Sequence, residues 1–161
     1  MDDFAQGLQV AQGDRLVDVI RVWGFRLGQE QDLTLFLTYL AGILPEFLRI
    51  LDDRRSDVGL RGVVAESLAE ISVALEARIR EITEAGDSRL PQARQLRATL
   101  VRGFSLCLER KTAVSGLAAI AKALAHLEIT PDIQGVVKRL REHPSPGVRR
   151  SLSPHVRLPS E

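Results

Sequence analysis

The sequence predicts an all-α protein. Apolar residues recur every three or four positions along most of the 161-residue chain, which is the spacing of one buried helix face. Short polar turns containing Asp, Ser, Thr, Gly or Pro separate these stretches. No segment alternates apolar and polar residues between hairpin turns, and no glycine-rich loop joins a strand to a helix. We therefore expect about seven helices and no sheet.

Seven stretches carry the helical pattern. Their approximate limits are residues 14–27, 33–51, 58–84, 88–110, 112–127, 131–143 and 146–152. The second stretch contains Pro45, which has no amide hydrogen and would either kink this helix or begin a new one, so we expect a break near residues 42–45. The first part of the second stretch, residues 33–44, is apolar nearly all round, so we expect a buried, central helix there. The third stretch should form a long helix.

Residues that commonly begin or end helices support these limits. Residues that can accept hydrogen bonds from the free amides of a helix N-terminus precede most stretches; they are Asp14, Asp32, Ser88, Thr112, Thr130 and Ser145. Pro131 and Pro146 follow two of these caps at the first helical position, where proline is well tolerated. Gly28 and Gly86 are suitable C-terminal stops.

One folded domain is expected over residues 14–152. A chain of this length removes about 70% of its unfolded surface from water on folding. Its content of 45% hydrophobic and 27% charged residues is typical of soluble globular proteins. The N-terminal segment 1–13 and the tail 153–161 are polar, and each either caps the domain or stays mobile.

The sequence favours a cytoplasmic protein. Cys107 is the only cysteine, so an internal disulfide and a cysteine-based zinc site are excluded. The acidic start of the chain does not resemble a signal peptide. The apolar stretch 33–51 is interrupted by Pro45, Glu46 and Arg49 and falls short of about 20 uninterrupted apolar residues, so we expect no membrane partner.

Charge is nearly balanced, although it is unevenly distributed. Arginine outnumbers lysine 19 to 3, yet the formal net charge is only +1, so no global field attracts nucleic acid. The C-terminal region is locally basic. Its bases are Lys138, Arg139, Arg141, Arg149, Arg150 and Arg157, which exceed Asp132, Glu142 and Glu161 by three.

Weak internal repeats run through the chain. The pair Leu44–Pro45 recurs as Leu90–Pro91 after 46 residues, and the Leu60–Arg61 pair is echoed by Val148–Arg149 after 88 residues. AESLAEI at 65–71 also matches AKALAHL at 121–127. These spacings suit two-helix repeats of about 40 to 47 residues, so the sequence contains three imperfect units.

These repeats resemble the HEAT-repeat family, in which a first helix has a leucine-proline step and a second opens, after an acidic turn, on a hydrophobic-arginine pair. The residues that fit this pattern are Leu44, Pro45, Asp53, Asp57, Leu60, Arg61, Ala65 and Leu68. The resemblance implies a short right-handed stack of antiparallel helix pairs, HEAT- or armadillo-like. An irregular helical bundle is the alternative, because any helix that buries one face shows the same apolar spacing.

No catalytic or cofactor motif is visible. Glu66 and Glu70 lie one turn apart without a helical Glu-x-x-His partner, and His126, His143 and His155 are not spaced for a zinc site. Cys107 lies on the apolar side of its helix, where a thiol normally acts as a small hydrophobe. We expect no metal and no cofactor.

The sequence therefore favours a non-enzymatic protein–protein interaction module, a scaffold or adaptor that binds a peptide segment or a partner helix. Helical repeats commonly bind in this way. Arginines in the acidic turn, at a helix start and in the basic C-terminal region are the candidates for partner contact: Arg54, Arg55, Arg61, Arg139, Arg141, Arg149 and Arg150. Because Asp57 is one turn from Arg61, an internal ion pair or a bond to a neighbouring helix end is the competing role for that arginine.

Three alternatives remain open. The basic C-terminal helices could bind nucleic acid through phosphate contacts. The chain could instead be a ligand-binding or enzymatic bundle, with a ligand between Trp23, Phe36, Tyr39 and Phe47. The ends of a short repeat array also need polar caps or another subunit, so homo-oligomerisation is a third possibility.

Overall fold

Seven α-helices and one 3₁₀ turn make up the part of the chain that the computed structural model describes, residues 14–154 and 156. They are α2 (Asp14–Gln29), α3 (Leu33–Asp52), α4 (Val58–Ala85), α5 (Leu90–Glu109), α6 (Val114–Ala123), η1 (Leu124–His126), α7 (Pro131–Arg141) and α8 (Pro146–Ser151). Within the described residues there is no strand. The predicted all-α class is confirmed.

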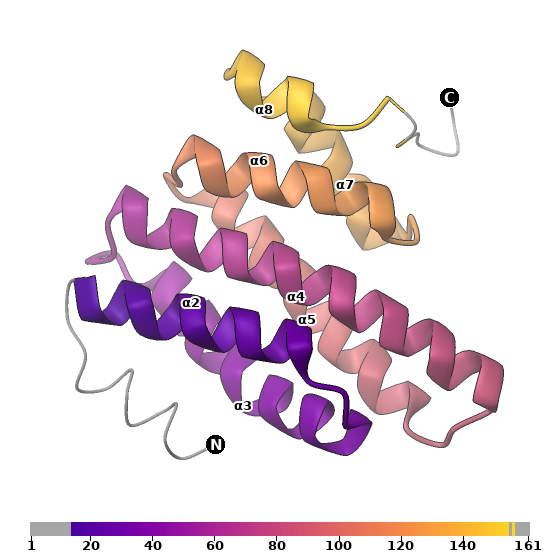
Figure 1. The fold of residues 1–161 in the computed structure, drawn as a ribbon. Helices are drawn as coiled ribbons and strands as arrows, with labels where there is room; N and C mark the ends of the chain where they lie inside the picture. The colour runs from indigo at the N-terminus through magenta and orange to yellow at the C-terminus, as the bar shows by residue number, and fades with distance from the viewer. Residues whose placement is uncertain (1–13, 155, 157–161) are drawn as a thin grey trace.

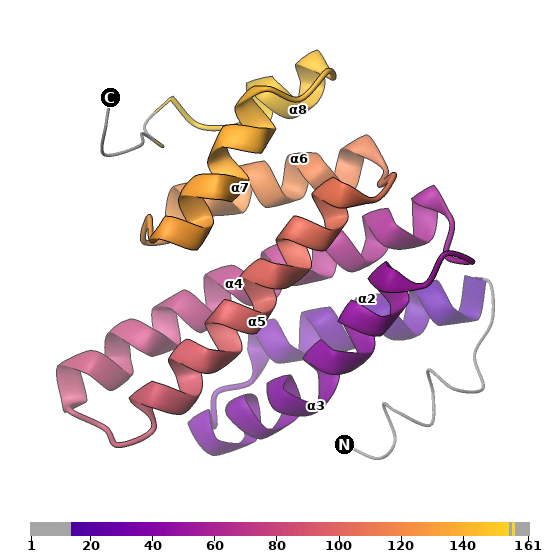
Figure 2. The same ribbon diagram turned by 180° about the vertical axis from the view of Figure 1, so that it is seen from behind.

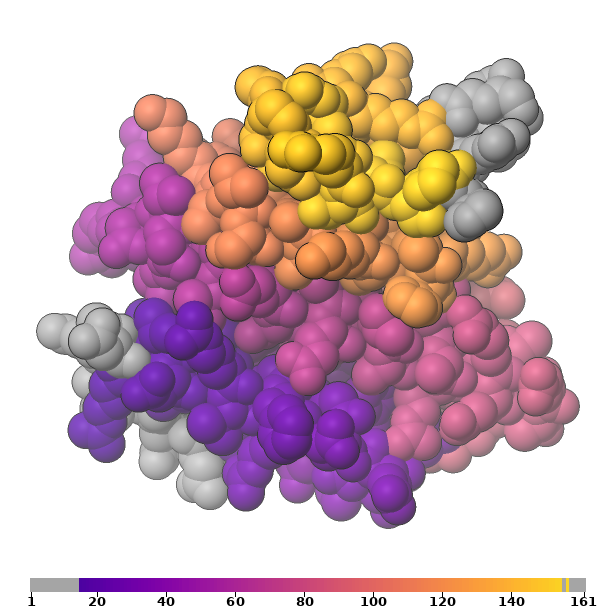
Figure 3. Space-filling model, turned by 45° about the horizontal axis from the view of Figure 1, so that its top comes forward, coloured from indigo at the N-terminus to yellow at the C-terminus, as the bar shows by residue number. Residues whose placement is uncertain are grey.

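The helices lie in two layers. In one layer α2 packs on α4, α4 on α6 and α6 on α8, as Figure 1 shows. In the second layer α3 packs on α5 and α5 on α7, and Figure 2 shows these helices in front. The close packing of α4 on α5 joins the layers. The surface repeats this order, because indigo α2, magenta α4, orange α6 and yellow α8 follow one another across the face in Figure 3.

The long helix α4 is the centre of the domain. It has 28 residues, of which 13 are buried, and it contacts helices of both layers. The carboxylate of Asp57 caps its start by accepting a hydrogen bond from the amide of Leu60 at 2.7 Å. Gly86 ends it with φ 64°, a left-handed conformation that glycine adopts without a steric cost. The predicted limits of this helix differ from the observed ones by a single residue.

The predicted break near Pro45 is wrong. Helix α3 runs without interruption from Leu33 to Asp52 with Pro45 inside it. Proline removes the hydrogen bond to the carbonyl four residues earlier, which belongs to Ala41. Because Pro45 and Ala41 are both exposed, water can bond that carbonyl. On the opposite side, the fully buried Leu44 and Phe47 hold this part of the helix in the core.

The length and composition of α3 alone would allow it to cross a membrane, and it is the one helix among the described residues of which this is true. Nine of its 20 residues are buried against the other helices, however. This burial favours the role of a core helix.

Two predicted caps act differently from expectation. Helix α5 begins at Leu90. The side chain that bonds the residue just before the helix is that of Asp87, not that of Ser88. The Asp87 carboxylate accepts hydrogen bonds from the amide of Arg89 at 2.9 Å and from its guanidinium at 2.7 Å, and these bonds lower the pKa of Asp87 to about 2. The Thr112 hydroxyl donates to the carbonyl of Cys107 at 2.7 Å, so it closes the end of α5 instead of opening α6.

The remaining caps are closer to prediction. Asp32 caps α3 by accepting from the amide of Leu35 at 3.0 Å. Thr130 and Ser145 occupy the N-cap positions of α7 and α8, although their side chains make no cap bond. Helix α2 begins at Asp14 itself and continues one residue past Gly28.

The predictions for the chain ends lie mostly outside the described residues. Segment 1–13 is outside them, as are His155 and positions 157–161 of the predicted tail. Val156 is described and is buried, with 4% of its surface exposed. The guanidinium of Arg141 donates to the Val156 carbonyl, so this position is packed against α7.

Helices α4 and α6 touch through glycine. A Cβ atom on Gly116 would lie 2.6 Å from the carbonyl oxygen of Gly62 and 2.7 Å from its Cα atom. These are backbone atoms of a buried helix, so they cannot move aside as a flexible side chain can. The spacing between the two helices therefore depends on glycine at position 116.

We expect Gly116→Ala to lower the free energy of unfolding by about 1–3 kcal/mol, because the added methyl group forces α4 and α6 apart. The matched control is Gly135→Ala in α7, where no atom lies within 4 Å of the new Cβ. That change should leave stability unchanged or raise it by up to about 1 kcal/mol through helix propensity. Urea unfolding followed by circular dichroism measures both, and equal effects of the two changes would contradict the close-contact interpretation.

Candidate functional site

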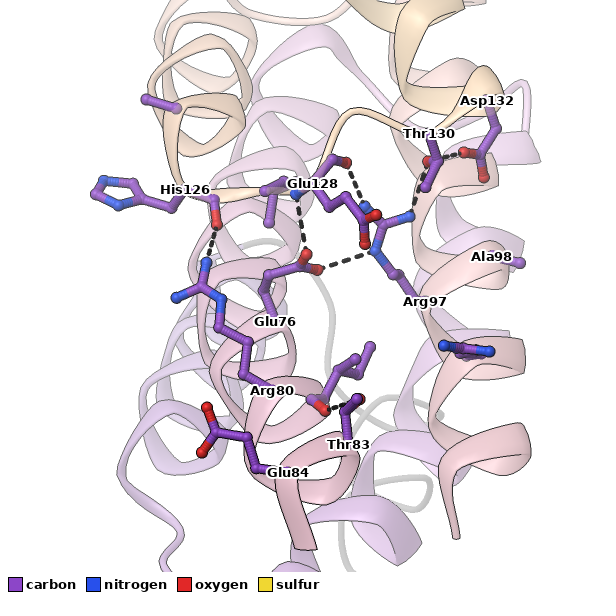
Figure 4. Close-up of a pocket in the computed structure, with 14 residues that line it drawn as sticks. Glu76, Arg80, Thr83, Glu84, Arg97, Ala98, His126, Glu128, Thr130 and Asp132 are labelled. Atoms are coloured by element: carbon purple, nitrogen blue, oxygen red, sulfur yellow. Dashed lines mark hydrogen bonds and ion pairs between the residues drawn. The ribbon is translucent and has the colours of Figure 1, made fainter. Parts of the chain in front are cut away.

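A groove of about 830 Å³ lies where the longer α4 and α5 extend beyond α6 (Figure 1), and Figure 4 shows the side chains that line it. Helix α4 has 28 residues, whereas α6 and η1 together have 13, so α6 and η1 do not cover the far end of α4. Residues of α4 between 76 and 84 and of α5 between 94 and 98 line the floor. The wall is formed by the end of η1, the link that follows it and the start of α7: Ala125, His126, Leu127, Glu128, Thr130 and Asp132.

A buried ion pair fixes the floor of the groove. The side chains of Glu76 and Arg97 are only 6% and 12% exposed, and Arg97 Nε lies 2.9 Å from Glu76 Oε2. The second carboxylate oxygen of Glu76 accepts a hydrogen bond from the amide of Glu128 at 2.9 Å. Both charged groups are thus paired, as burial requires.

All three guanidinium nitrogens of Arg97 donate hydrogen bonds, two of them to the wall of the groove. Besides its bond to Glu76, it donates to the carbonyl of Glu128 at 2.7 Å and to the hydroxyl of Thr130 at 3.0 Å. The Thr130 hydroxyl in turn donates to the carboxylate of Asp132 (Figure 4). Through this network α4, α5 and the link before α7 are tied together, so the groove is formed before any partner arrives.

A second arginine secures the other end of the wall. Arg80 on α4 donates to the carbonyl of His126 at 2.9 Å, at the last residue of η1. Arg80 is exposed and lines the groove, and its guanidinium has donors beyond the one that bonds His126.

The rim carries both charges. Arg94 and Glu84 are exposed and form no hydrogen bond or ion pair within residues 14–154 and 156. Exposed Asp132 and the exposed His126 ring complete the rim. Between them the floor offers Ile79 and Ala98 as a small apolar strip. This arrangement can receive a chain that bears acidic and basic groups, with small side chains between them.

The arginines predicted in the first repeat have separate environments. Arg54 and Arg55 are exposed in the turn before α4, and Arg55 pairs with Asp53 at 3.2 Å, which lowers the pKa of that carboxyl. Arg61 is only 8% exposed. It donates to the carbonyls of Lys111 at 2.9 Å and Asp53 at 3.3 Å, so it joins two successive inter-helix links rather than facing solvent.

The predicted C-terminal arginines mostly bond to their own chain. Arg141, Arg149 and Arg150 each donate to backbone carbonyls of α7, α8 or the segments beside them. Arg139 Nη1 lies 3.9 Å from a carboxylate oxygen of Glu109. None of the seven predicted arginines lines the groove, and the structure does not bring them into one cluster.

The four aromatic residues proposed as a ligand site are also divided. Phe36 and Phe47 are fully buried in the core. Trp23 and Tyr39 meet edge to face, with ring centroids 6.1 Å apart, and line a separate hollow of about 480 Å³ beside the α2–α3 link. Phe36 and Phe47 do not line this hollow.

Other reactive groups lie away from the groove. Cys107 is fully buried, and burial raises the pKa of its thiol to about 12, so it is not a nucleophile near neutral pH. In the described part of the chain, no group of three or more His, Cys, Asp or Glu is arranged to hold a metal ion.

The sequence interpretation missed Glu76 and Arg97. Each residue stands next to a leucine of its helix's apolar stripe, Leu75 and Leu96, which is the available signal of partial burial. They are 21 positions apart in the sequence, and this spacing gives no indication that they meet, because contact depends on how α5 folds back along α4.

Comparisons with protein-family models, with curated proteins and with solved structures find no match for this chain.

We expect Glu76→Ala to lower the free energy of unfolding by about 3 kcal/mol, because it leaves the Arg97 guanidinium buried without its counter-charge. The control is Glu84→Ala, an exposed position near the C-terminal end of α4 that lines the same groove. This change should alter stability by less than about 0.5 kcal/mol. Urea unfolding measures both. Faster hydrogen exchange of the Glu128 amide in Glu76→Ala would show that the wall has lost its anchor, and unchanged exchange would contradict this role.

Cys107 should resist thiol reagents in the folded protein. Its raised pKa and burial leave almost no reactive thiolate at about pH 8, so labelling should follow the unfolding rate. The same reagent in concentrated urea is the control, where labelling should be fast. Rapid labelling without denaturant would show that α5 opens locally.

Proposed function

We propose that this protein is a non-enzymatic interaction module in which a short HEAT- or armadillo-like stack of antiparallel helix pairs presents the groove to an extended peptide segment. The pairs are α3 with α4, α5 with α6, and α7 with α8. The alternating order of the two layers supports a stack, because each unit then contacts only its neighbours.

Contacts between equivalent positions of successive pairs support the same architecture. The amide of Ala113, before α6, donates to the carbonyl of Val58 at the start of α4 at 3.1 Å. Arg61, in the first turn of α4, reaches the carbonyl of Lys111, just before α6. The opening of one second helix is therefore bonded to the opening of the next, as expected for repeated units.

The observation that carries the proposed function is the anchored groove. A wall fixed by a buried ion pair loses little freedom when a partner binds, so less of the contact energy is spent on ordering the site. The groove is open along the α4–α5 pair and bears free charges of both signs. These properties suit a peptide with an acidic side chain opposite Arg94 and a basic side chain opposite Glu84.

The test starts with selection of binders from a displayed peptide library, followed by calorimetric titration of the best sequences against the full chain. We expect Arg94→Glu to weaken a selected peptide by about tenfold or more, because like charges then face each other. Exchange of the peptide's acidic residue for lysine should restore binding to this variant. The matched control is Arg102→Glu, an exposed position on the same helix outside the groove, which should bind as the unaltered protein does.

Two results would overturn the proposal. One is a library from which no sequence is enriched, and the other is a set of peptides that bind Arg94→Glu undiminished. Strongly salt-dependent binding of DNA or RNA that is lost in Arg149→Glu would instead assign the activity to the basic α7–α8 region.

A further inference from the structure

The outward face of α2 has no partner among residues 14–154 and 156. Helix α2 is the first of its layer, and α4 covers only one side of it. Gly24 lies on that covered side, where a Cβ atom would be 2.9 Å from Ser67 Oγ, and Ile20 and Leu27 are buried with it. On the opposite side Val22 and Phe25 are 53% and 59% exposed, and they are the two most exposed large hydrophobic residues of the described chain.

The exposed face has the residue spacing of a helix-pairing seam. Its members lie alternately three and four residues apart: Arg15, Asp18, Val22, Phe25 and Gln29. Such spacing keeps one stripe facing a neighbouring helix over several turns. The stripe is apolar at its centre and polar at both ends, and α4 does not use it.

We propose that a second copy of this chain packs on this face, with the two α2 helices antiparallel across a twofold axis between Val22 and Phe25. Each Val22 then lies against Phe25 of the partner subunit. The same alignment sets Asp18 beside Gln29 of the partner subunit, with the partner's Arg26 about 4.5 Å further along the helix axis and within reach of its long side chain.

Charge complementarity selects a second copy as the occupant. Asp18 and Arg26 are both exposed, and neither forms a hydrogen bond or ion pair within the described residues. The Arg26 guanidinium is held over the Trp23 ring, 5.3 Å from its centroid, at the edge of the seam. A twofold axis pairs acid with base twice, which is the self-complementarity that an isologous dimer requires.

The contact is limited to one helix of 16 residues on each side, so the interface falls at the small end of specific interfaces, below about 1,200 Å². We therefore expect a reversible dimer whose population rises with protein concentration.

Sedimentation velocity of the full chain over a wide concentration range provides the first test. The unaltered protein should show a concentration-dependent dimer, and Phe25→Glu should abolish it, because a charge would be buried on each side of the axis. The matched control is Val114→Glu at the start of α6, a position that is 48% exposed, and it should dimerise normally. Circular dichroism should show unchanged helix content in both variants, because both positions are on the surface.

Charge exchange tests the antiparallel register. Asp18→Arg and Arg26→Glu should each weaken the homodimer by about tenfold or more, because each places like charges together twice. When the two variants are mixed, both contacts again join opposite charges, so the heterodimer should form about as well as the original dimer. The double variant Asp18→Arg/Arg26→Glu should also dimerise.

A protein that stays monomeric at every concentration would overturn the proposal, whether the face is then covered by residues 1–13 or by another protein. A dimer that survives Phe25→Glu, or single charge variants that fail to recover on mixing, would overturn it equally. These readouts do not involve the groove, so they are distinct from the peptide-binding test.

Discussion

The structure depends on the close packing of one long helix, α4, against the helices around it. Its contact with α6 is set by Gly62 and Gly116, where no side chain could be accommodated without displacing backbone. That contact fixes the spacing within one layer, and the packing of α4 on α5 fixes the second layer relative to the first. The groove follows from the same helix, because α4 is much longer than the helix beside it.

Arginine side chains on α4 and α5 bond the segments between helices to these two helices. Arg61, Arg78 and Arg80 lie on α4 and Arg97 lies on α5, and each donates to a backbone carbonyl far away in the sequence. The planar guanidinium can satisfy a carbonyl and a carboxylate at once, which lysine cannot do with the same geometry. The strong preference of this chain for arginine over lysine therefore has an internal explanation as well as any explanation through partners.

The two proposed surfaces lie on different parts of the helical domain. The groove belongs to the far end of the α4–α5 pair and the link before α7, whereas the self-association seam is the outward face of α2. A dimer through α2 would carry two grooves in one assembly. It would then hold a partner with two suitable segments more tightly than one groove could, without any new contact inside the groove.

The sequence by itself determined the helical class, the order and approximate limits of the helices, and the buried stripe of α4, because these follow from local spacing and capping groups. It did not determine the continuity of α3, because the exposure of Pro45 and Ala41 depends on which side of the helix faces the core. Nor did it show that Arg61 is an internal tie or that Glu76 meets Arg97. Only the tertiary structure decided these roles, since the partners of a charged side chain depend on how distant helices fold back on one another.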